Sequence, residues 1–301
     1  MSDRLMEGQH IRGRGRLADY SNLVKLPHTV FALPFAMVGA TLASYEHAVK
    51  WTDLVLILVA FTSARFAAMG FNRIVDRAID ARNPRTRMRE IPAGKLSVAE
   101  ATLSVTVASA TFLACAGLLN RLCLILAPLA LGWILFYSYT KRFTRWPHLV
   151  LGGALAIAPV GAYLAIAGAW SRPAAALLVL AGGVLCWVAG FDILYSLQDI
   201  EFDREQGLHS IPAALGAPRA LVVSRILHAL SAGFFLSLGF LFPALGTLYF
   251  VATGVIAVML IYEQSLVRSD DLSRIDAAFF NLNGAISVIF FLMVLTERLL
   301  A

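Results

Sequence analysis

The feature that most constrains the fold is a succession of long apolar segments separated by short polar breaks. A helix needs about 20 mostly apolar residues to cross a bilayer. Nine segments reach or approach that length: 23–45, 53–80, 97–119, 122–140, 149–168, 173–200, 220–242, 247–267 and 277–298. They are much longer than β-strands and show no alternation of apolar and polar residues. The sequence therefore predicts an all-α integral membrane bundle of nine transmembrane helices.

The distribution of charge supports this prediction. Hydrophobic residues make up 59% of the chain and charged residues 15%, whereas soluble domains are about one quarter charged. With nine spans, one side of the bundle carries Arg4, Arg12, Arg14, Arg16, Lys25, Arg82, Arg85, Arg87, Arg89, Lys95, Lys141, Arg142, Arg145, Arg204, Arg219, Arg268 and Arg274. The other side carries Lys50, Arg121, Arg172 and Arg298. The positive-inside rule explains the net charge of +6 without a nucleic-acid partner. It predicts that the basic side faces the cytoplasm, with an N-terminal segment, 1–22, before the transmembrane domain, 23–301.

Three polar residues, Asn72, Asp76 and Asp80, end the second apolar segment at a spacing of four residues. On a helix this spacing places them on one face, close to the cytoplasmic interface. Oxygen ligands of this kind suit Mg²⁺, which binds one or two carboxylates together with phosphate oxygens of a substrate. The alternative is a solvated helix end without a metal.

A second ladder with the same spacing, Tyr195, Asp199 and Asp203, ends the sixth segment on the same predicted side. The loops that follow the ladders share a phrase, REIPAGKL at 89–96 and HSIPAALG at 209–216. This internal similarity predicts two related half-bundles whose ladders face each other across a central cavity.

Four carboxylates that face one another would repel, so cations are required between them. Two Mg²⁺ ions and a diphosphate of about −3 charge would still leave an excess of about −3. The basic residues predicted to compensate it and to bind the diphosphate are Arg77, Arg85, Arg89, Lys141 and Arg142. Arginine suits this role because it binds phosphate oxygens with two parallel hydrogen bonds.

With these motifs the chain resembles the UbiA superfamily of intramembrane aromatic prenyltransferases. The resemblance rests on NRIVDRAID (72–80), YSLQDIEFD (195–203), the basic YTKRF (139–143) and the nine spans. KLPHTVFALPFA (25–36) and DREQGLHSIPAALG (203–216) are similar to the bacterial quinone-pathway branch. One departure is Met88-Arg89-Glu90-Ile91-Pro92, where many members read Asn-Arg-Pro-Leu.

The resemblance implies a function and a set of site residues. It implies Mg²⁺-dependent transfer of a polyprenyl group from a polyprenyl diphosphate to an aromatic acid at the bacterial inner membrane. The acceptor would be 4-hydroxybenzoate for ubiquinone, or a menaquinone precursor of the futalosine route. The implied metal ligands are Asn72, Asp76, Asp80, Asp199 and Asp203, with Tyr195 as a further catalytic residue, and Arg77 and Arg142 lie near the diphosphate.

Arg65 and Asp192 are the candidates for binding the acceptor. Arg65 lies seven residues before Asn72, on the same helical face but deeper in the membrane, where an unpaired arginine is costly. It would bind the carboxylate of a benzoate-type acceptor or form an ion pair with Asp192. Asp192 would alternatively orient the acceptor hydroxyl group or take its proton.

Several other residues have a structural and a functional interpretation. His28 and His209 are expected to be ordinary interfacial and loop histidines, with substrate contact as the alternative. Phe31, Phe35, Phe66 and Phe71 are candidates for stabilising a carbocation, whereas most of the 19 phenylalanines in the chain must be ordinary packing. Glu90, Glu201 and Glu205 are expected to be loop charges without a role.

A cation transporter is the alternative from another functional class, since intramembrane acids and repeats suit it too. A cation pathway has no evident need for an arginine-rich loop beside the acids, whereas a diphosphate site does. The sequence does not predict the oligomeric state.

Overall fold

The structure is a computed structural model that describes residues 15–24, 29–275 and 277–301. All regular elements within these ranges are helical, so the prediction of an all-α bundle is confirmed. Lys25 and His28 lie outside the described residues, as do Arg4, Arg12 and Arg14, and the side chain of Phe31 is also not described.

The long helices follow the predicted apolar segments closely. They are α2 (Thr29–Ala43), α3 (Trp51–Asp80), α4 (Val98–Leu119), α5 (Arg121–Thr140), α6 (Pro147–Ala167), α7 (Ala175–Ser196), α10 (Ala217–Leu241), α11 (Thr247–Leu266) and α12 (Asn283–Leu300). The short elements are α1 (Arg16–Leu23), the 3₁₀ turn η2 (Leu197–Asp199), α8 (Ile200–Glu205), α9 (Ile211–Leu215) and the π-helical turn η3 (Ala277–Leu282). In the described ranges, eight helices are long and apolar enough to cross a membrane, and α2 is a shorter ninth.

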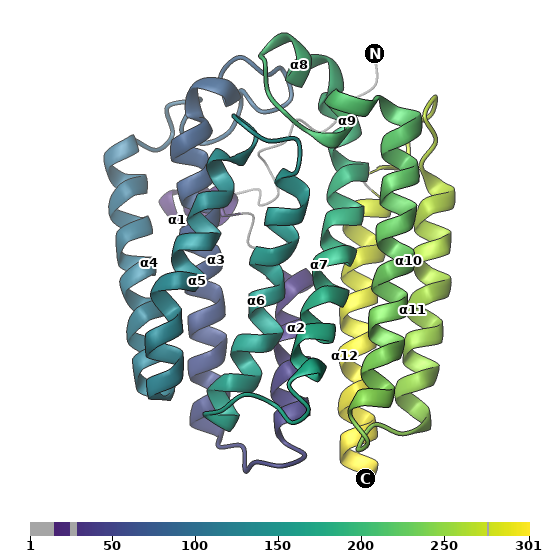
Figure 1. The fold of residues 1–301 in the computed structure, drawn as a ribbon. Helices are drawn as coiled ribbons and strands as arrows, with labels where there is room; N and C mark the ends of the chain where they lie inside the picture. Colours follow the sequence, from purple (N-terminus) through teal and green to yellow (C-terminus); the bar gives the residue numbers. More distant parts are fainter. Residues whose placement is uncertain (1–14, 25–28, 276) are drawn as a thin grey trace.

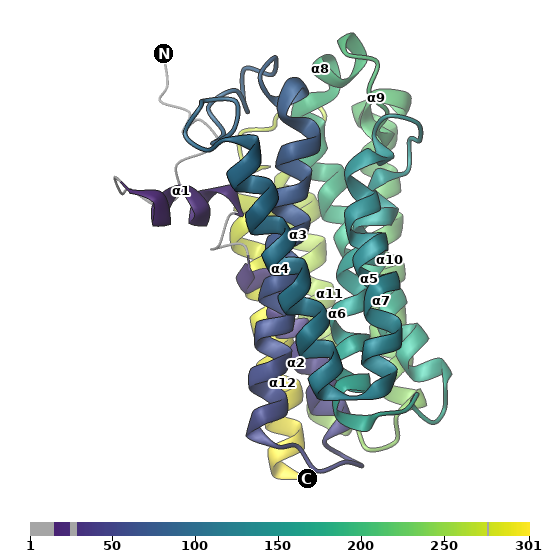
Figure 2. The same ribbon diagram turned by 90° about the vertical axis from the view of Figure 1, so that its left-hand side faces the viewer.

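Figure 1 shows how the helices divide. The helix of the first ladder, α3, lies with α4 and α5 on one side of the bundle, and the helix of the second ladder, α7, lies with α10, α11 and α12 on the other. Helices α2 and α6 pack against each other and connect the two groups. Both ladders therefore lie at the same end of the bundle. The central cavity between the groups stays a prediction. Figure 2 shows α1 lying crosswise beside the bundle.

Local sequence signals explain the helix boundaries on the α4–α6 side. Ser97 caps α4: its Oγ accepts a hydrogen bond from the Glu100 backbone N–H at 3.2 Å, and Glu100 Oε2 accepts the Ser97 N–H at 3.0 Å. Asn120 caps α5 by accepting the Cys123 N–H at 2.9 Å. Its Nδ2 donates to the Leu164 carbonyl at 2.9 Å, which ties the start of α5 to the end of α6.

Burial separates the central helix from the outer ones. Most residues of α7 are buried, which explains why its sequence is apolar on every face. Leu103, Leu118 and Leu129 on α4 and α5 are largely exposed instead. Exposed leucines on this scale are expected where helices face lipid rather than water.

Phe35, one of the aromatic candidates for carbocation contact, packs in the core. It is 1% exposed, and its ring centroid lies 4.7 Å from that of Trp187 and 5.7 Å from that of Phe235. Phe71 contacts Tyr139 edge to face at 5.9 Å. Ordinary packing accounts for both rings, so neither is assigned a role in catalysis.

Candidate active site

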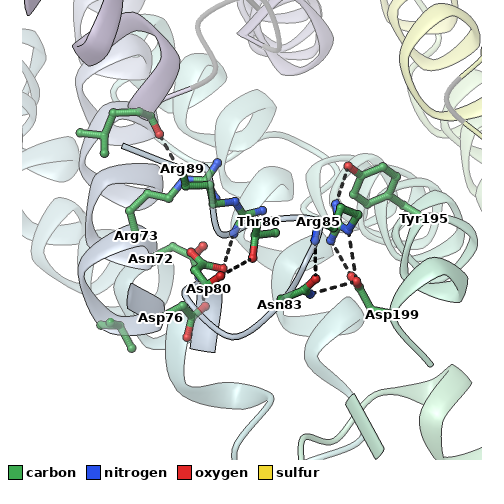
Figure 3. Close-up of polar contacts among 12 residues, drawn as sticks. Asn72, Arg73, Asp76, Asp80, Asn83, Arg85, Thr86, Arg89, Tyr195 and Asp199 are labelled. Atoms are coloured by element: carbon green, nitrogen blue, oxygen red, sulfur yellow. Dashed lines mark hydrogen bonds and ion pairs between the residues drawn. The ribbon is translucent and has the colours of Figure 1, made fainter. Parts of the chain in front are cut away.

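The first ladder lies on the last turns of α3. Asn72 Nδ2 donates to Asp76 Oδ2 at 2.8 Å, so these two side chains share one face of the helix as their spacing predicts. Asp76 is partly buried and accepts a hydrogen bond from Arg142 Nη2 at 2.8 Å. Asp80 is buried and forms an ion pair with Arg89 Nη1 at 2.6 Å. Figure 3 shows the three ladder residues beside the loop that carries Arg89.

The second ladder crosses a change of helix type. Tyr195 lies in the last turn of α7, Asp199 ends the 3₁₀ turn η2, and Asp203 lies on the short helix α8. Asp199 and Asp203 are both buried. The sequence pattern predicts one straight helical face, whereas the backbone tightens at Leu197–Asp199 before α8 begins.

The loop after α3 joins the two ladders. Arg85 donates from Nε and Nη2 to the two carboxylate oxygens of Asp199, at 3.1 and 2.6 Å, and from Nη1 to the Tyr195 hydroxyl at 3.0 Å. Asn83 Nδ2 adds a bond to Asp199 Oδ1 at 3.3 Å. Figure 3 shows Arg85 between Tyr195 and Asp199. A residue five positions after Asp80 therefore holds the second ladder.

Short-range hydrogen bonds give this loop its shape. Asn83 Oδ1 accepts the backbone N–H of Arg85 at 2.9 Å, which is an Asx turn. The Thr86 hydroxyl donates to the Asp80 carbonyl at 3.1 Å and closes the end of α3. Asn83 and Thr86 are both buried, so the direction of Arg85 is determined by buried polar residues rather than by solvated ones.

The segment after α5 provides the remaining basic partners. Lys141 Nζ lies 3.5 Å from Asp203 Oδ2, and Arg142 reaches Asp76 on the other ladder. Burial alone would lower the pKa of Lys141, but the carboxylates of Asp203, Asp199 and Asp192 raise it above its ordinary value. Each of the four ladder carboxylates thus has a basic partner among the residues predicted to bind the diphosphate.

Arg77 is the predicted diphosphate ligand that the structure does not bring to the ladders. Its side chain is exposed, and Nη1 donates to the carbonyl of Ile74 in its own helix at 2.8 Å. One residue along a helix turns the side chain by about 100°, so Arg77 points away from the face that carries Asp76.

The acceptor candidates do not pair with each other. Arg65 is partly buried, and its Nε is buried without a hydrogen-bond partner among the described residues. Asp192 Oδ2 lies 2.6 Å from His148 Nδ1, and the Ile211 N–H donates to His148 Nε2 at 3.4 Å. This second bond implies that the proton sits on Nδ1 and is donated to Asp192.

Sequence reasoning missed His148, a lone histidine in the first turn of α6 that carries no motif. Its significance comes from two tertiary contacts, and no local signal indicates either. His209 has an exposed side chain, and its backbone N–H lies 2.7 Å from the Lys141 carbonyl. This arrangement matches the expected solvated loop histidine.

Glu90 corrects the expectation of a solvated loop charge. It is 1% exposed, and both carboxylate oxygens are buried without hydrogen-bond partners among the described residues. Burial raises the pKa of the Glu90 carboxyl above its ordinary value. The loops that share the Ile-Pro-Ala phrase also fold differently, because Ser210 caps the short helix α9 whereas 89–96 forms only turns.

Comparisons with known proteins agree with this architecture. The family model described as the UbiA prenyltransferase family matches residues 32–285. A 4-hydroxybenzoate octaprenyltransferase of Coxiella burnetii is 29% identical over 289 residues, covering 95% of this chain and 98% of the relative.

Two solved structures resemble the fold. The apo structure of a UbiA homologue from Aeropyrum pernix K1 aligns with a TM-score of 0.82 and 36% identity, covering 90% of this chain and 98% of that one. A UbiA homologue from Archaeoglobus fulgidus, bound to GPP and Mg²⁺, aligns with a TM-score of 0.69 and 21% identity, covering 92% of this chain and 99% of that one. The chain therefore belongs to the UbiA prenyltransferase family, and it is an integral membrane prenyltransferase.

Proposed function

We propose that this protein transfers a polyprenyl group from a polyprenyl diphosphate to a ring carbon of 4-hydroxybenzoate in ubiquinone biosynthesis, and that the reaction requires Mg²⁺. One observation carries the proposal. Arg85, in the loop after the first ladder, forms an ion pair with Asp199 of the second ladder, and every ladder aspartate has a basic partner. The octaprenyltransferase relative supports the acceptor and a long prenyl chain. The Archaeoglobus fulgidus homologue bound to GPP and Mg²⁺ supports the donor and the metal.

The donor atoms of the ladders fit Mg²⁺. Asp80 Oδ2 and Asp203 Oδ2, one on each ladder, are buried carboxylate oxygens without a hydrogen-bond partner in the described part of the chain. Hard cations take oxygen ligands of this kind, with Asn72, Asp76 and Asp199 as the remaining candidates. Bound Mg²⁺ would supply positive charge that polarises the diphosphate and eases its departure.

The basic residues have two alternative sets of partners. The four ladder carboxylates and their four basic partners are formally neutral together. We therefore infer that Arg85, Arg89, Arg142 and Lys141 would move from carboxylate to phosphate oxygens when the diphosphate binds, which would leave the ladder carboxylates available to hold Mg²⁺.

The chemistry then follows from these partners. Arg85 has the planar guanidinium that binds two phosphate oxygens at once. The bond between the allylic carbon and the diphosphate oxygen breaks, and its electron pair leaves with the diphosphate. Electrons of the aromatic ring form the new carbon–carbon bond, and the ring then loses a proton. Water would trap the cation, so the apolar surroundings of the bundle protect it.

Arg65 and Asp192 would bind the acceptor. The Nε of Arg65 has no hydrogen-bond partner in the described residues, so it can donate to an anionic ligand such as a benzoate carboxylate. His148 donates to Asp192 Oδ2 and thereby orients this carboxylate. Asp192 would hydrogen-bond to the acceptor hydroxyl group or take its proton.

Replacement of Arg65 by Ala is expected to raise the KM for 4-hydroxybenzoate by about tenfold to a hundredfold, because a charge-assisted hydrogen bond contributes about 1.5–3 kcal/mol. The KM for the prenyl diphosphate should change little. Steady-state kinetics with each substrate varied separately measures both. Arg65→Lys, which keeps the charge but loses the planar fork, should fall between wild type and Arg65→Ala. An unchanged acceptor KM in Arg65→Ala would exclude the acceptor role.

The experiment that tests the function is a product assay with purified protein in detergent, Mg²⁺, octaprenyl diphosphate and a panel of acceptors. The expected result is a prenylated 4-hydroxybenzoate, identified by mass spectrometry, which is absent when EDTA replaces Mg²⁺. If a naphthoate from the futalosine route is prenylated and 4-hydroxybenzoate is not, the naphthoate is the acceptor. Absence of any prenylated product, together with cation uptake in vesicles, would favour a transporter.

The site is proposed to face the cytoplasm of a bacterial inner membrane. Arg82, Arg85, Lys141, Arg142 and Arg204 all belong to segments at the ladder end of the bundle. An excess of arginine and lysine marks the cytoplasmic side of a membrane protein.

A further inference from the structure

A buried polar cluster lies apart from the ladders, between α7, α11 and α12. Trp187 Nε1 donates to Asn283 Oδ1 at 2.7 Å, and Asn283 Nδ2 donates to Glu263 Oε1 at 2.9 Å. All three residues have an exposed fraction of 0%. In the described part of the chain none of the three forms a side-chain hydrogen bond or ion pair with a ladder residue, and the proposed prenyl transfer does not use them.

Asn283 also holds the backbone of the π-helical turn η3. Its Nδ2 lies 3.2 Å from the carbonyl oxygens of both Ala278 and Phe279, which belong to this turn. π-Helical turns are rare and occur frequently at functional sites. The cluster of Trp187, Asn283 and Glu263 therefore fixes one irregular turn of the backbone against two neighbouring helices.

The turn places an aromatic side chain on the second ladder. The ring of Phe279 stacks on that of Tyr195 with centroids 4.1 Å apart and an angle of 27° between the planes. Phe191 contacts Phe279 edge to face at 5.4 Å. The Tyr195 hydroxyl accepts the bond from Arg85, and the Arg85 guanidinium carbon lies 5.3 Å from the Tyr195 ring centroid. The contacts thus lead from Glu263 through Asn283, Phe279 and Tyr195 to Arg85.

Glu263 is a costly residue to keep at this position if it serves packing alone. Its Oε2 is buried without a hydrogen-bond partner among the residues described. Burial of a polar group without a partner costs free energy, and an apolar side chain of similar volume would avoid that cost. Acids within membrane helices are rare and usually serve a function.

From these contacts we infer that Glu263 and Asn283 are positioning residues for the prenyl transfer. They hold η3 so that Phe279 fixes the Tyr195 ring, and Tyr195 in turn holds Arg85 where it can pass from Asp199 to the diphosphate. This inference rests on the proposed function of the second ladder. Glu263 acts as a hydrogen-bond acceptor for Asn283, so its negative charge is not needed.

The test compares three variants of neighbouring residues on α11. Glu263→Leu should lower kcat/KM for the prenyl diphosphate by about 10- to 100-fold, because a small misplacement of a substrate-positioning group has effects of that size. Glu263→Gln keeps an acceptor oxygen for Asn283 and should stay within about twofold of wild type. Gln264→Leu is the matched control: it removes partly buried bonds of 2.7 and 3.0 Å to Ser224 and His228 but no hydrogen bond to η3 among the described residues. It should keep the wild-type kcat/KM.

A double-mutant cycle separates positioning from general stability. Phe279→Leu should by itself lower kcat/KM in the same direction, and Glu263→Leu should add little in the Phe279→Leu background. Independent, additive effects would overturn the inference, and so would wild-type kinetics for Phe279→Leu. If Glu263→Leu does not fold, the Phe279→Leu result decides. A wild-type protein without prenyl transfer activity would instead refute the proposed function.

Discussion

Replacement of Asp199 by Asn is expected to lower kcat by about a thousandfold or more. Asp199 accepts bonds from Arg85 and Asn83 and is a predicted metal ligand on the second ladder. Metal-ion stabilisation of a departing anion is worth several kcal/mol, and each 1.36 kcal/mol changes a rate by about tenfold. The amide keeps the shape of the side chain, so the protein should remain folded. Asp76→Asn on the first ladder should have the same effect. Turnover under saturating substrates measures both variants.

The matched control for Asp199→Asn is Glu201→Gln. Glu201 lies two residues further along the chain, on α8, and its side chain is exposed. The same change from acid to amide should leave kcat within about twofold of wild type, because exposed charges are screened and interact weakly. Circular dichroism and gel filtration in detergent should show that all three variants are folded. Near-normal turnover in Asp76→Asn or Asp199→Asn would refute the two-ladder site.

Replacement of Arg85 by Ala is expected to lower kcat/KM for the prenyl diphosphate and to raise the affinity for Mg²⁺. The variant loses the guanidinium that joins Tyr195 and Asp199, and kcat/KM for the prenyl diphosphate should fall by about 10²- to 10³-fold. Asp199 also loses its cationic partner, so Mg²⁺ without substrate should bind more tightly than it does to wild type. Isothermal titration of Mg²⁺ and steady-state kinetics measure the two effects.

Arg87→Ala separates the role of Arg85 from the charge of the loop as a whole. Arg87 lies two residues away in the same loop, and its side chain is exposed. Its replacement should change kcat/KM for the prenyl diphosphate and the Mg²⁺ affinity by less than about threefold each. A fall in Mg²⁺ affinity in Arg85→Ala would contradict the exchange of partners, because it would mean that Arg85 helps to hold the metal in the absence of substrate.

The fold was predictable because lipid imposes a simple rule on sequence. Long apolar segments mark the helices, and the boundaries of α3, α4 and α5 differ from the predicted ones by two residues or fewer. A separate short helix, α1 (Arg16–Leu23), ends where the first apolar segment was predicted to begin. Polar residues at a helix end do not show where the chain leaves the membrane, so this boundary was predicted less well.

The pairing of charges within the site was not predictable. Spacing identified both ladders, because a helix brings residues four apart onto one face. The partner of each aspartate depends on the loop, where buried Asn83 and Thr86 direct Arg85 across to Asp199. Arg77 was predicted to join the site, but it lies on another face of α3. The contact of His148 with Asp192 joins residues 44 positions apart, and neither sequence segment indicates the other.

We propose above all that the two ladders form one site for Mg²⁺ and diphosphate. The most direct measurement is a count of bound Mn²⁺, used in place of Mg²⁺, by electron paramagnetic resonance in the presence of an unreactive prenyl thiodiphosphate. We expect about two tightly bound ions per protein with the analogue. Both Asp76→Asn and Asp199→Asn should bind fewer ions. A full count of bound ions in either variant would contradict a single site formed by both ladders.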